Sequence, residues 1–243
     1  MTATSTQGPA PTRMPTPPER AAGVVLAAGL GIVAWASGRK PLHAVGTTWD
    51  AELRIDAPTP HLGAHLLMDR GVHPCTARIS RALGTRDGWW DIGGLALRIP
   101  GEGSRGGPAD VLFATTGTGR LTRHLLRPVG RATARPLTTL LPTRAAGHSV
   151  TLLAQPVHRP TDADGTVRDY EVAVSVDRGP WEVVGLLQLH ADLPDSTTRF
   201  DPIVNELEGT SAPAWVIAVR EPAYRWARRL GSRRLRGGRA RPH

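Results

Sequence analysis

The chain has 243 residues, of which 40% are hydrophobic and 21% charged; this excludes a wholly disordered protein and suffices for one large domain or two small ones. Its one cysteine, Cys75, excludes an internal disulfide bond. The formal net charge is +9, but nine arginines and a single acid lie in residues 219–243, so the rest of the chain is nearly neutral.

Two segments precede the predicted body of the protein. Residues 1–20 are rich in Thr, Pro and Ser without an apolar period, and we expect them to be disordered. Residues 21–38, AAGVVLAAGLGIVAWASG, carry no charge and reach the length of a short membrane span. Three interpretations stay open for them: a helix packed on the body of a cytoplasmic protein, a membrane anchor, or an export signal whose cleavage site is AWA.

From residue 41 onward, short runs of alternating apolar and polar residues indicate β-strands. Turn signals rich in Gly, Asp and Pro separate the runs, and the chain holds 27 glycines and 22 prolines. Many short strands joined by hairpins predict a closed antiparallel barrel or a sandwich. The predicted strands are TWDAELRI (48–55), CTARIS (75–80), GLALRIP (94–100), DVLFAT (110–115), SVTLLAQPV (149–157), DYEVAVSV (169–176) and WEVVGLLQLH (181–190).

Helices are predicted beside the strands, which makes the expected fold class α+β. Residues 119–140 have helical character, interrupted by two prolines, and residues 221–235 predict a terminal helix with Pro222 in its first turn. Residues 230–243 form an Arg-rich tail. The tail is either a solvated basic end or a contact with an anionic surface such as a lipid membrane; no specific nucleic acid is expected.

Several common catalytic motifs are absent from the sequence. There is no G-x-x-x-x-G-K-[ST], no G-x-S-x-G and no H-E-x-x-H. His61 and His65 stand four residues apart, as metal ligands on a helix do, but Pro60 precedes them and no acid stands at a suitable spacing. We therefore predict no metal site at these two histidines.

Four segments, in order, resemble the catalase-like haem protein superfamily. They match its patterns His-Ala-x-Gly, Arg-Phe-Ser followed by Asp-x-x-Gly-Phe-Ala, Asp-Leu before asparagines, and Phe-Asp-Pro before Arg-x-x-x-Tyr. The resemblance implies a short form of this superfamily, an antiparallel catalase-like β-barrel with flanking helices over residues 39–229. The four segments are PLHAVG (41–46), TARISRALGTRDGWWDIGGLALRIPG (76–101), DVLFATT (110–116) and RFDPIVNELEGTSAPAWVIAVREPAYRWARR (199–229).

The resemblance implies haem b as the cofactor. Tyr224 matches the tyrosine that ligates the iron, and Arg220 stands one helical turn before it, where a cation lowers the pKa of a phenol. Arg78 matches the arginine near the haem propionates, a role for which a guanidinium group suits carboxylates.

The resemblance places three further residues on the opposite side of the haem, where a peroxide binds. His43 matches the histidine that moves protons on a bound peroxide, and Ser80 matches the serine that fixes the tautomer of that histidine. The distal asparagine of catalases is replaced, since the matching positions are Ala114 and Thr115; the Thr115 hydroxyl is the candidate donor. At three further positions the chain has aliphatic residues where catalases have phenylalanines, which predicts a differently lined haem pocket. These residues are Ile79, Leu95 and Ile99.

The implied function is peroxidase or hydroperoxide-converting activity on a hydroperoxide or a small apolar substrate. Three alternatives stay open. The chain could be a haem-free barrel that binds an apolar ligand in its cavity, or a phosphodiesterase-type hydrolase on the same fold. It could also be a non-enzymatic protein that residues 21–38 and the Arg-rich tail hold at a membrane. The oligomeric state is not predicted.

Overall fold

The structure is a computed structural model that describes residues 45–81, 90–130, 134–140, 142–158, 167–194, 200–202 and 204–212. Within these ranges it has ten β-strands and four single-turn 3-10 helices, and no α-helix. The disordered segment predicted at 1–20, the helices predicted at 21–38 and 221–235 and the Arg-rich tail lie outside the described residues. The flanking helices of the expected fold therefore stay predictions.

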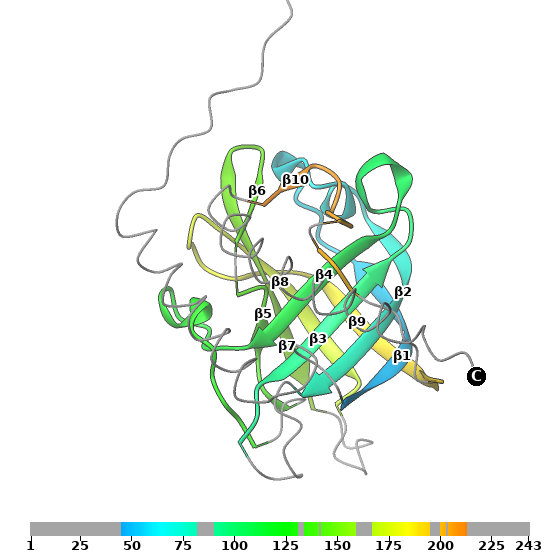
Figure 1. The fold of residues 1–243 in the computed structure, drawn as a ribbon. Helices are drawn as coiled ribbons and strands as arrows, with labels where there is room; N and C mark the ends of the chain where they lie inside the picture. The colour runs from blue at the N-terminus through cyan, green and yellow to red at the C-terminus, as the bar shows by residue number, and fades with distance from the viewer. Residues whose placement is uncertain are drawn as a thin grey trace, which may run out of the picture. The chain divides into compact units, whose positions relative to one another are not determined.

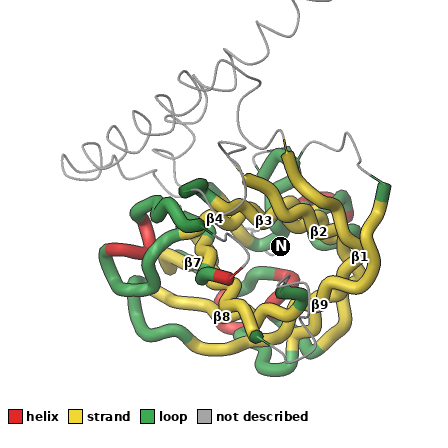
Figure 2. Tube along the Cα trace, turned by 90° about the horizontal axis from the view of Figure 1, so that it is seen from below, coloured by secondary structure: helices red, strands yellow, loops and turns green. Residues whose placement is uncertain are grey.

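Eight of the strands close an antiparallel barrel, which Figure 1 shows from the side and Figure 2 shows end-on. The order around the ring is β1–β2–β3–β4–β5–β7–β8–β9 and back to β1, while β6 and β10 extend the sheet beyond β7. The bounds are β1 Val45–Ile55, β2 Gly71–Arg81, β3 Gly93–Ile99, β4 Ala109–Thr115, β5 Leu137–Thr138, β6 Thr143–Ala145, β7 His148–Val157, β8 Asp169–Val176, β9 Glu182–Leu193 and β10 Thr210–Ser211.

All seven predicted strands are present, because alternation of side chains is what a barrel wall requires. Along β1, Ala51, Leu53 and Ile55 are buried inside the barrel, while Asp50 and Arg54 are exposed on its outer face. A shift of one residue would exchange the two faces, so this pattern also sets the register of the strand.

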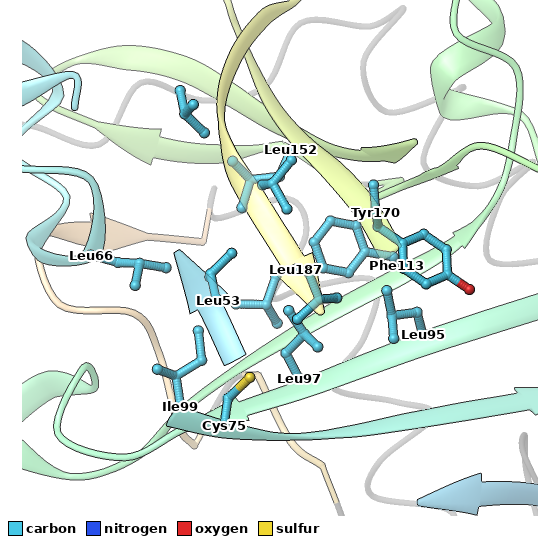
Figure 3. Packing of buried hydrophobic residues seen from close by; sticks show 14 of the residues in the cluster. Leu53, Leu66, Cys75, Leu95, Leu97, Ile99, Phe113, Leu152, Tyr170 and Leu187 are labelled. Atoms are coloured by element: carbon cyan, nitrogen blue, oxygen red, sulfur yellow. The ribbon is translucent and has the colours of Figure 1, made fainter. Parts of the chain in front are cut away.

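The inside of the barrel is filled by side chains. Figure 3 shows Leu53, Leu97, Phe113 and Tyr170 gathered there, and each is at most 4% exposed. A cavity of about 10 Å³, which is room for at most one water molecule, lies among Leu53, Leu97, Phe113 and other apolar side chains. This cavity is too small for the apolar ligand that one alternative places inside the barrel, and that alternative stays a prediction without support from it.

Cys75 belongs to this core, as a lone cysteine entering a strand usually does. It lies on β2 opposite Ala51 and is 5% exposed. Burial raises the pKa of its thiol to about 12, so the thiolate is not formed at neutral pH.

Residues 119–140 are not the helix that the sequence predicts. The described part of this region holds one 3-10 turn, Thr122–His124, followed by extended chain and β5. Prolines at 128 and 136 remove two of the backbone donors that a helix needs. Tertiary contacts of Arg123 then hold the segment against the turn between β8 and β9.

Arg123 is 2% exposed and fastens this loop by three hydrogen bonds. Its guanidinium group donates to Ser175 Oγ over 2.5 Å, to the Gly179 carbonyl over 3.3 Å and to the Gly119 carbonyl over 3.2 Å. It also lies 4.2 Å from the centre of the Trp181 ring, within the range of a cation–π interaction. A buried charge is tolerated here because its donors have acceptors.

We expect Arg123→Met to lower the free energy of unfolding by about 2 kcal/mol, because it leaves the Ser175 and Gly179 acceptors without their charged donor. Arg54→Met is the matched control, since Arg54 is exposed and pairs only with Asp56 over 3.0 Å; its effect should stay within about 0.5 kcal/mol. Chemical denaturation measures both. Equal effects of the two substitutions would contradict the role given to Arg123.

Candidate functional site

The outer face of β1–β4 carries two of the residues that the catalase resemblance selects. Residues paired across neighbouring strands point to the same face of a sheet, so the strand registers define rows of side chains. Gly46 pairs with Ser80, Ser80 with Gly94, and Gly94 with Ala114. No side chain in this row is larger than serine, which gives the outer face a flat strip across four strands. We call it the small-residue row.

The row beside it is polar at one end. It runs from Thr48 through Arg78 and Ala96 to Leu112. Thr48 is only 1% exposed although it faces outward, and its Oγ1 has no hydrogen-bond partner among the described residues. Arg78 is half-buried beside it. Buried polar groups normally have partners, so an unpaired hydroxyl next to a guanidinium group marks this part of the face as a candidate ligand site.

Ser80 belongs to the small-residue row and lies next to Arg78 of the neighbouring row. It is 5% exposed, and its Oγ lies 3.5 Å from the Gly94 carbonyl, to which it donates a long hydrogen bond. A hydroxyl that donates to the strand keeps its oxygen as an acceptor, which is the role that the resemblance gives to Ser80.

Gly46 allows β1 to approach β2 closely at this point. A Cβ atom at Gly46 would lie 2.5 Å from the Ile79 carbonyl oxygen and 2.9 Å from Ser80 Cβ. Any larger residue would therefore push the two strands apart beside Ser80. The glycine that ends the His-Ala-x-Gly pattern thus has a structural reason of its own in this chain.

Thr115 is not brought together with Arg78 and Ser80, because its side chain points to the inner face of the barrel. It is fully buried, accepts a hydrogen bond from Gly93 N over 3.1 Å and donates one to the Arg127 carbonyl over 2.9 Å. Its hydroxyl proton is therefore committed to the backbone. Ala114, in the small-residue row, is the position that shares the outer face with Ser80.

The aliphatic replacements of phenylalanine also lie inside the barrel. Leu95 and Ile99 are 2% and 1% exposed, and Ile79 packs against the same core. They do not line the outer face of β1–β4, and the expectation that they change the lining of a haem pocket stays a prediction. Their effect is on the packing of the core.

The segment 200–205 is anchored to the outer face of β3 and β4. Asp110 forms a bidentate pair with Arg98, at 2.7 and 2.6 Å, and its Oδ2 also accepts from Asp201 N and Asn205 Nδ2, each over 2.7 Å. The Phe200 ring stacks 5.2 Å from the Arg98 guanidinium carbon. The Phe-Asp-Pro pattern of the sequence is therefore held on the same face as Arg78 and Ser80.

His43, Arg220 and Tyr224 lie outside the described residues, and their roles stay predictions. His43 precedes the first residue of β1 by two positions, and Tyr224 follows the last described residue, 212, by twelve positions.

A second polar cluster, which the sequence did not reveal, joins two loops to the first residues of β2. Glu102 accepts hydrogen bonds from His65 Nδ1 over 2.7 Å and from His73 Nδ1 over 3.0 Å. His73 Nε2 is buried and has no hydrogen-bond partner among the described residues. Glu102 stands 37 residues from His65, so no short spacing could indicate this cluster.

No metal site is formed by these groups. Across the ranges that the structure describes, no set of three or more His, Cys, Asp or Glu side chains is arranged to hold a metal ion. The cluster instead joins loops. The His65 amide donates to the Glu208 carbonyl and the Glu208 amide to the Glu102 carbonyl, each over 2.9 Å. The three loops at this end of the barrel are fastened to one another.

None of the helices in the described part of the chain could cross a membrane, since each is a single 3-10 turn. A cytoplasmic location and a membrane association through residues 21–38 stay predictions.

Comparison with solved structures identifies the fold. Catalase A from Saccharomyces cerevisiae matches 74% of this chain with a TM-score of 0.56 at 12% sequence identity. The fold is catalase-like. A second fungal catalase matches 77% of the chain with a TM-score of 0.53, also at 12% identity. The matched region spans 58% of the length of each catalase. No protein-family model matches the sequence, and a comparison with curated proteins finds no similar sequence.

The Glu102 cluster gives folding a pH dependence. The hydrogen bond and charge of Glu102 raise the pKa of His65 above 6.5, with smaller contributions from Glu208 and Asp69. The His65 imidazole therefore binds its second ring proton more tightly in the folded protein than in the unfolded chain. The stabilisation is complete below about pH 6.5 and is lost as the pH rises through the higher pKa of the folded state.

We expect an NMR titration to place the His65 pKa above 6.5 in the wild type and nearer 6.5 in Glu102→Gln, because the substitution removes the carboxylate that is the largest cause of the shift. Asp69→Asn is the matched control and should change the pKa less. An unchanged His65 titration in Glu102→Gln would show that the two side chains do not interact in solution.

Proposed function

We propose that this chain is a catalase-related haem protein with peroxidase or hydroperoxide-converting activity, and that haem b lies against the outer face of β1–β4. The observation that carries the proposal is the small-residue row beside the buried, unpaired Thr48 hydroxyl and the Arg78 guanidinium. The catalase-like fold is consistent with the proposal, and β1, the strand that follows His43 in the chain, is part of this face.

The residues of this face fit a flat group that has carboxylate arms. A strip without side chains larger than serine lets a planar macrocycle approach the strands closely. Arg78, two residues from Ser80 on the same face, offers a fork of donors that matches a propionate. The filled interior of the barrel leaves no competing position for a molecule of this size.

In the mechanism that we propose, haem would supply a redox-active iron for hydroperoxide chemistry; Tyr224 would hold the group, and Arg220 would stabilise the Tyr224 phenolate. His43 would accept the proton of the hydroperoxide and return it to the oxygen that leaves as an alcohol or water. The Ser80 hydroxyl accepts the other ring N–H of His43 and so fixes its tautomer. Arg78 pairs with a propionate and orients the group.

The outer face lacks the amide donor of catalases, because Ala114 occupies its position. His43 would then work without a second donor to orient the peroxide. We infer that turnover of hydrogen peroxide is slow relative to that of larger hydroperoxides, which gain binding energy from their apolar part. No observation among the described residues favours the phosphodiesterase-type alternative.

The first test uses the only two tyrosines of the chain. We expect haem to give the wild type a Soret band that weakens or shifts in Tyr224→Phe, because the substitution removes the ligand of the iron. Tyr170→Phe is the matched control: Tyr170 is 1% exposed and donates to the Val167 carbonyl over 3.4 Å, so its loss should leave the band unchanged. A wild type that gains no Soret band when haem is added overturns the proposal.

A second test depends on which face each side chain occupies. We expect Ala114→Asn to raise hydrogen peroxide turnover about tenfold or more, because it places an amide donor in the same row as Ser80. Thr115→Asn should instead lower the free energy of unfolding by about 2 kcal/mol, because it breaks the contacts of a fully buried hydroxyl. Increased turnover in Thr115→Asn alone would place the reaction on the inner face and refute the proposed site.

A further inference from the structure

One loop presents arginines and leucines together on the surface of the barrel. Residues 117–125 leave the end of β4, in green in Figure 1, and lie against the turn between β8 and β9. Arg120 Nε donates to the Arg178 carbonyl over 3.0 Å, and Trp181 Nε1 donates to the Thr118 carbonyl over 2.8 Å. These contacts join the two segments into one surface. We call Arg120, Leu121, Leu125 and Arg178 the arginine–leucine patch.

The leucines of the patch are exposed to an unusual degree. Leu121 is 75% exposed and Leu125 59%, although they stand on one short turn and leave apolar carbon in contact with water. Single exposed apolar residues are common on protein surfaces, but two on one turn beside unpaired cations are not explained by the fold. The loop is attached to the barrel by hydrogen bonds of Arg123, His124 and Trp181, none of which involves a leucine side chain.

The positive charge of the patch is not neutralised. No ion pair joins Arg120, Arg123 or Arg178 to a carboxylate among the described residues. Asp177, which precedes Arg178, instead accepts hydrogen bonds from His148 Nδ1 over 2.7 Å and from Ser149 N over 2.8 Å.

The pKa values beside the patch are consistent with this excess of charge. Burial lowers the pKa of Arg123, and Arg120 and Arg178 lower it further. The pKa of His124 is lowered by its burial and by Arg178 and Arg123. No acid contributes to either shift, so the local potential is positive.

We propose that the arginine–leucine patch docks the barrel on an anionic lipid bilayer. Leu121 and Leu125 enter the boundary between headgroups and acyl chains, while Arg120 and Arg178 pair with lipid phosphates. Charge complementarity selects an anionic partner, and the leucines select one with an accessible apolar layer. The phosphates of a nucleic acid would satisfy the arginines and leave the leucines unburied. This docking is independent of haem and of the Arg-rich tail.

The first experiment reports insertion at one position of the full-length chain. A polarity-sensitive fluorophore is attached to Leu121→Cys and, as the control, to Val72→Cys, which is 54% exposed on β2. The native Cys75 is 5% exposed with a pKa of about 12 and is not labelled. With phosphatidylglycerol-containing vesicles we expect a blue shift of emission at 121 and none at 72. Phosphatidylcholine vesicles should give no shift at either position.

Three results would overturn the proposal. They are the absence of vesicle binding, binding without a shift at 121, and equal shifts at 121 and 72. The second result would assign membrane contact to the tail or to residues 21–38 instead, and the third would indicate adsorption without a preferred face.

Charge substitutions give a separate measurement. Replacing Arg120 and Arg178 by glutamine should weaken partition onto anionic vesicles about fivefold for each arginine. The matched control replaces Arg54 and Arg144 by glutamine. Both are exposed and lie outside the patch, and their replacement lowers the net charge by the same amount as the first double variant. Equal weakening in the two double variants would show that only total charge matters, and the patch would then have no role.

Discussion

The close packing of side chains inside the barrel decides where every other residue of its strands can act. Because a strand alternates between faces, a residue that does not belong to the core has to face outward. Leu53, Leu97 and Phe113 occupy the interior so fully that the remaining cavity measures about 10 Å³. This cavity is too small for a ligand larger than water, which favours the outer face as the place for a ligand site.

Two different uses of the outer face follow from its rows. In the row that contains Arg98 and Asp110, the fully buried Asp110 carboxylate accepts four hydrogen bonds and fixes residues 200–205 on the barrel. Two rows away, the small-residue row offers almost no side chains at all. The outer face thus holds residues 200–205 at the row of Asp110 and offers a row of small side chains two rows away. A site assembled from distant segments depends on both.

Much of this arrangement could be predicted from the sequence, because strands and motif order depend on local patterns. The alternating runs located seven strands, and the segment order indicated the catalase-like barrel that the structural comparison supports. Closure of the ring was not predictable in the same way, since the pairing of β7 with β8 and of β1 with β9 depends on the whole molecule. The helix expected within 119–140 fails for the same reason: Arg123 obtains its acceptor from Ser175, 52 residues away.

The candidate site shows where local reasoning ends. The sequence offered Ala114 and Thr115 as equivalent matches to one asparagine, and only the strand register separates an outward residue from an inward one. The shared carboxylate of Glu102 was also hidden, because one of its two histidines lies in a loop and the other on β2. In both cases the deciding information is a pairing between residues far apart in the chain.

The buried thiol of Cys75 has a consequence for a protein proposed to handle hydroperoxides. Oxidation to sulfenic acid begins with the thiolate, which a thiol of pKa about 12 does not form at neutral pH. Since Cys75 is the one cysteine of the chain, the protein has no thiol that an oxidant can easily reach. It could therefore meet repeated doses of peroxide without inactivating itself through cysteine, and it would not need a cellular reductant to restore it.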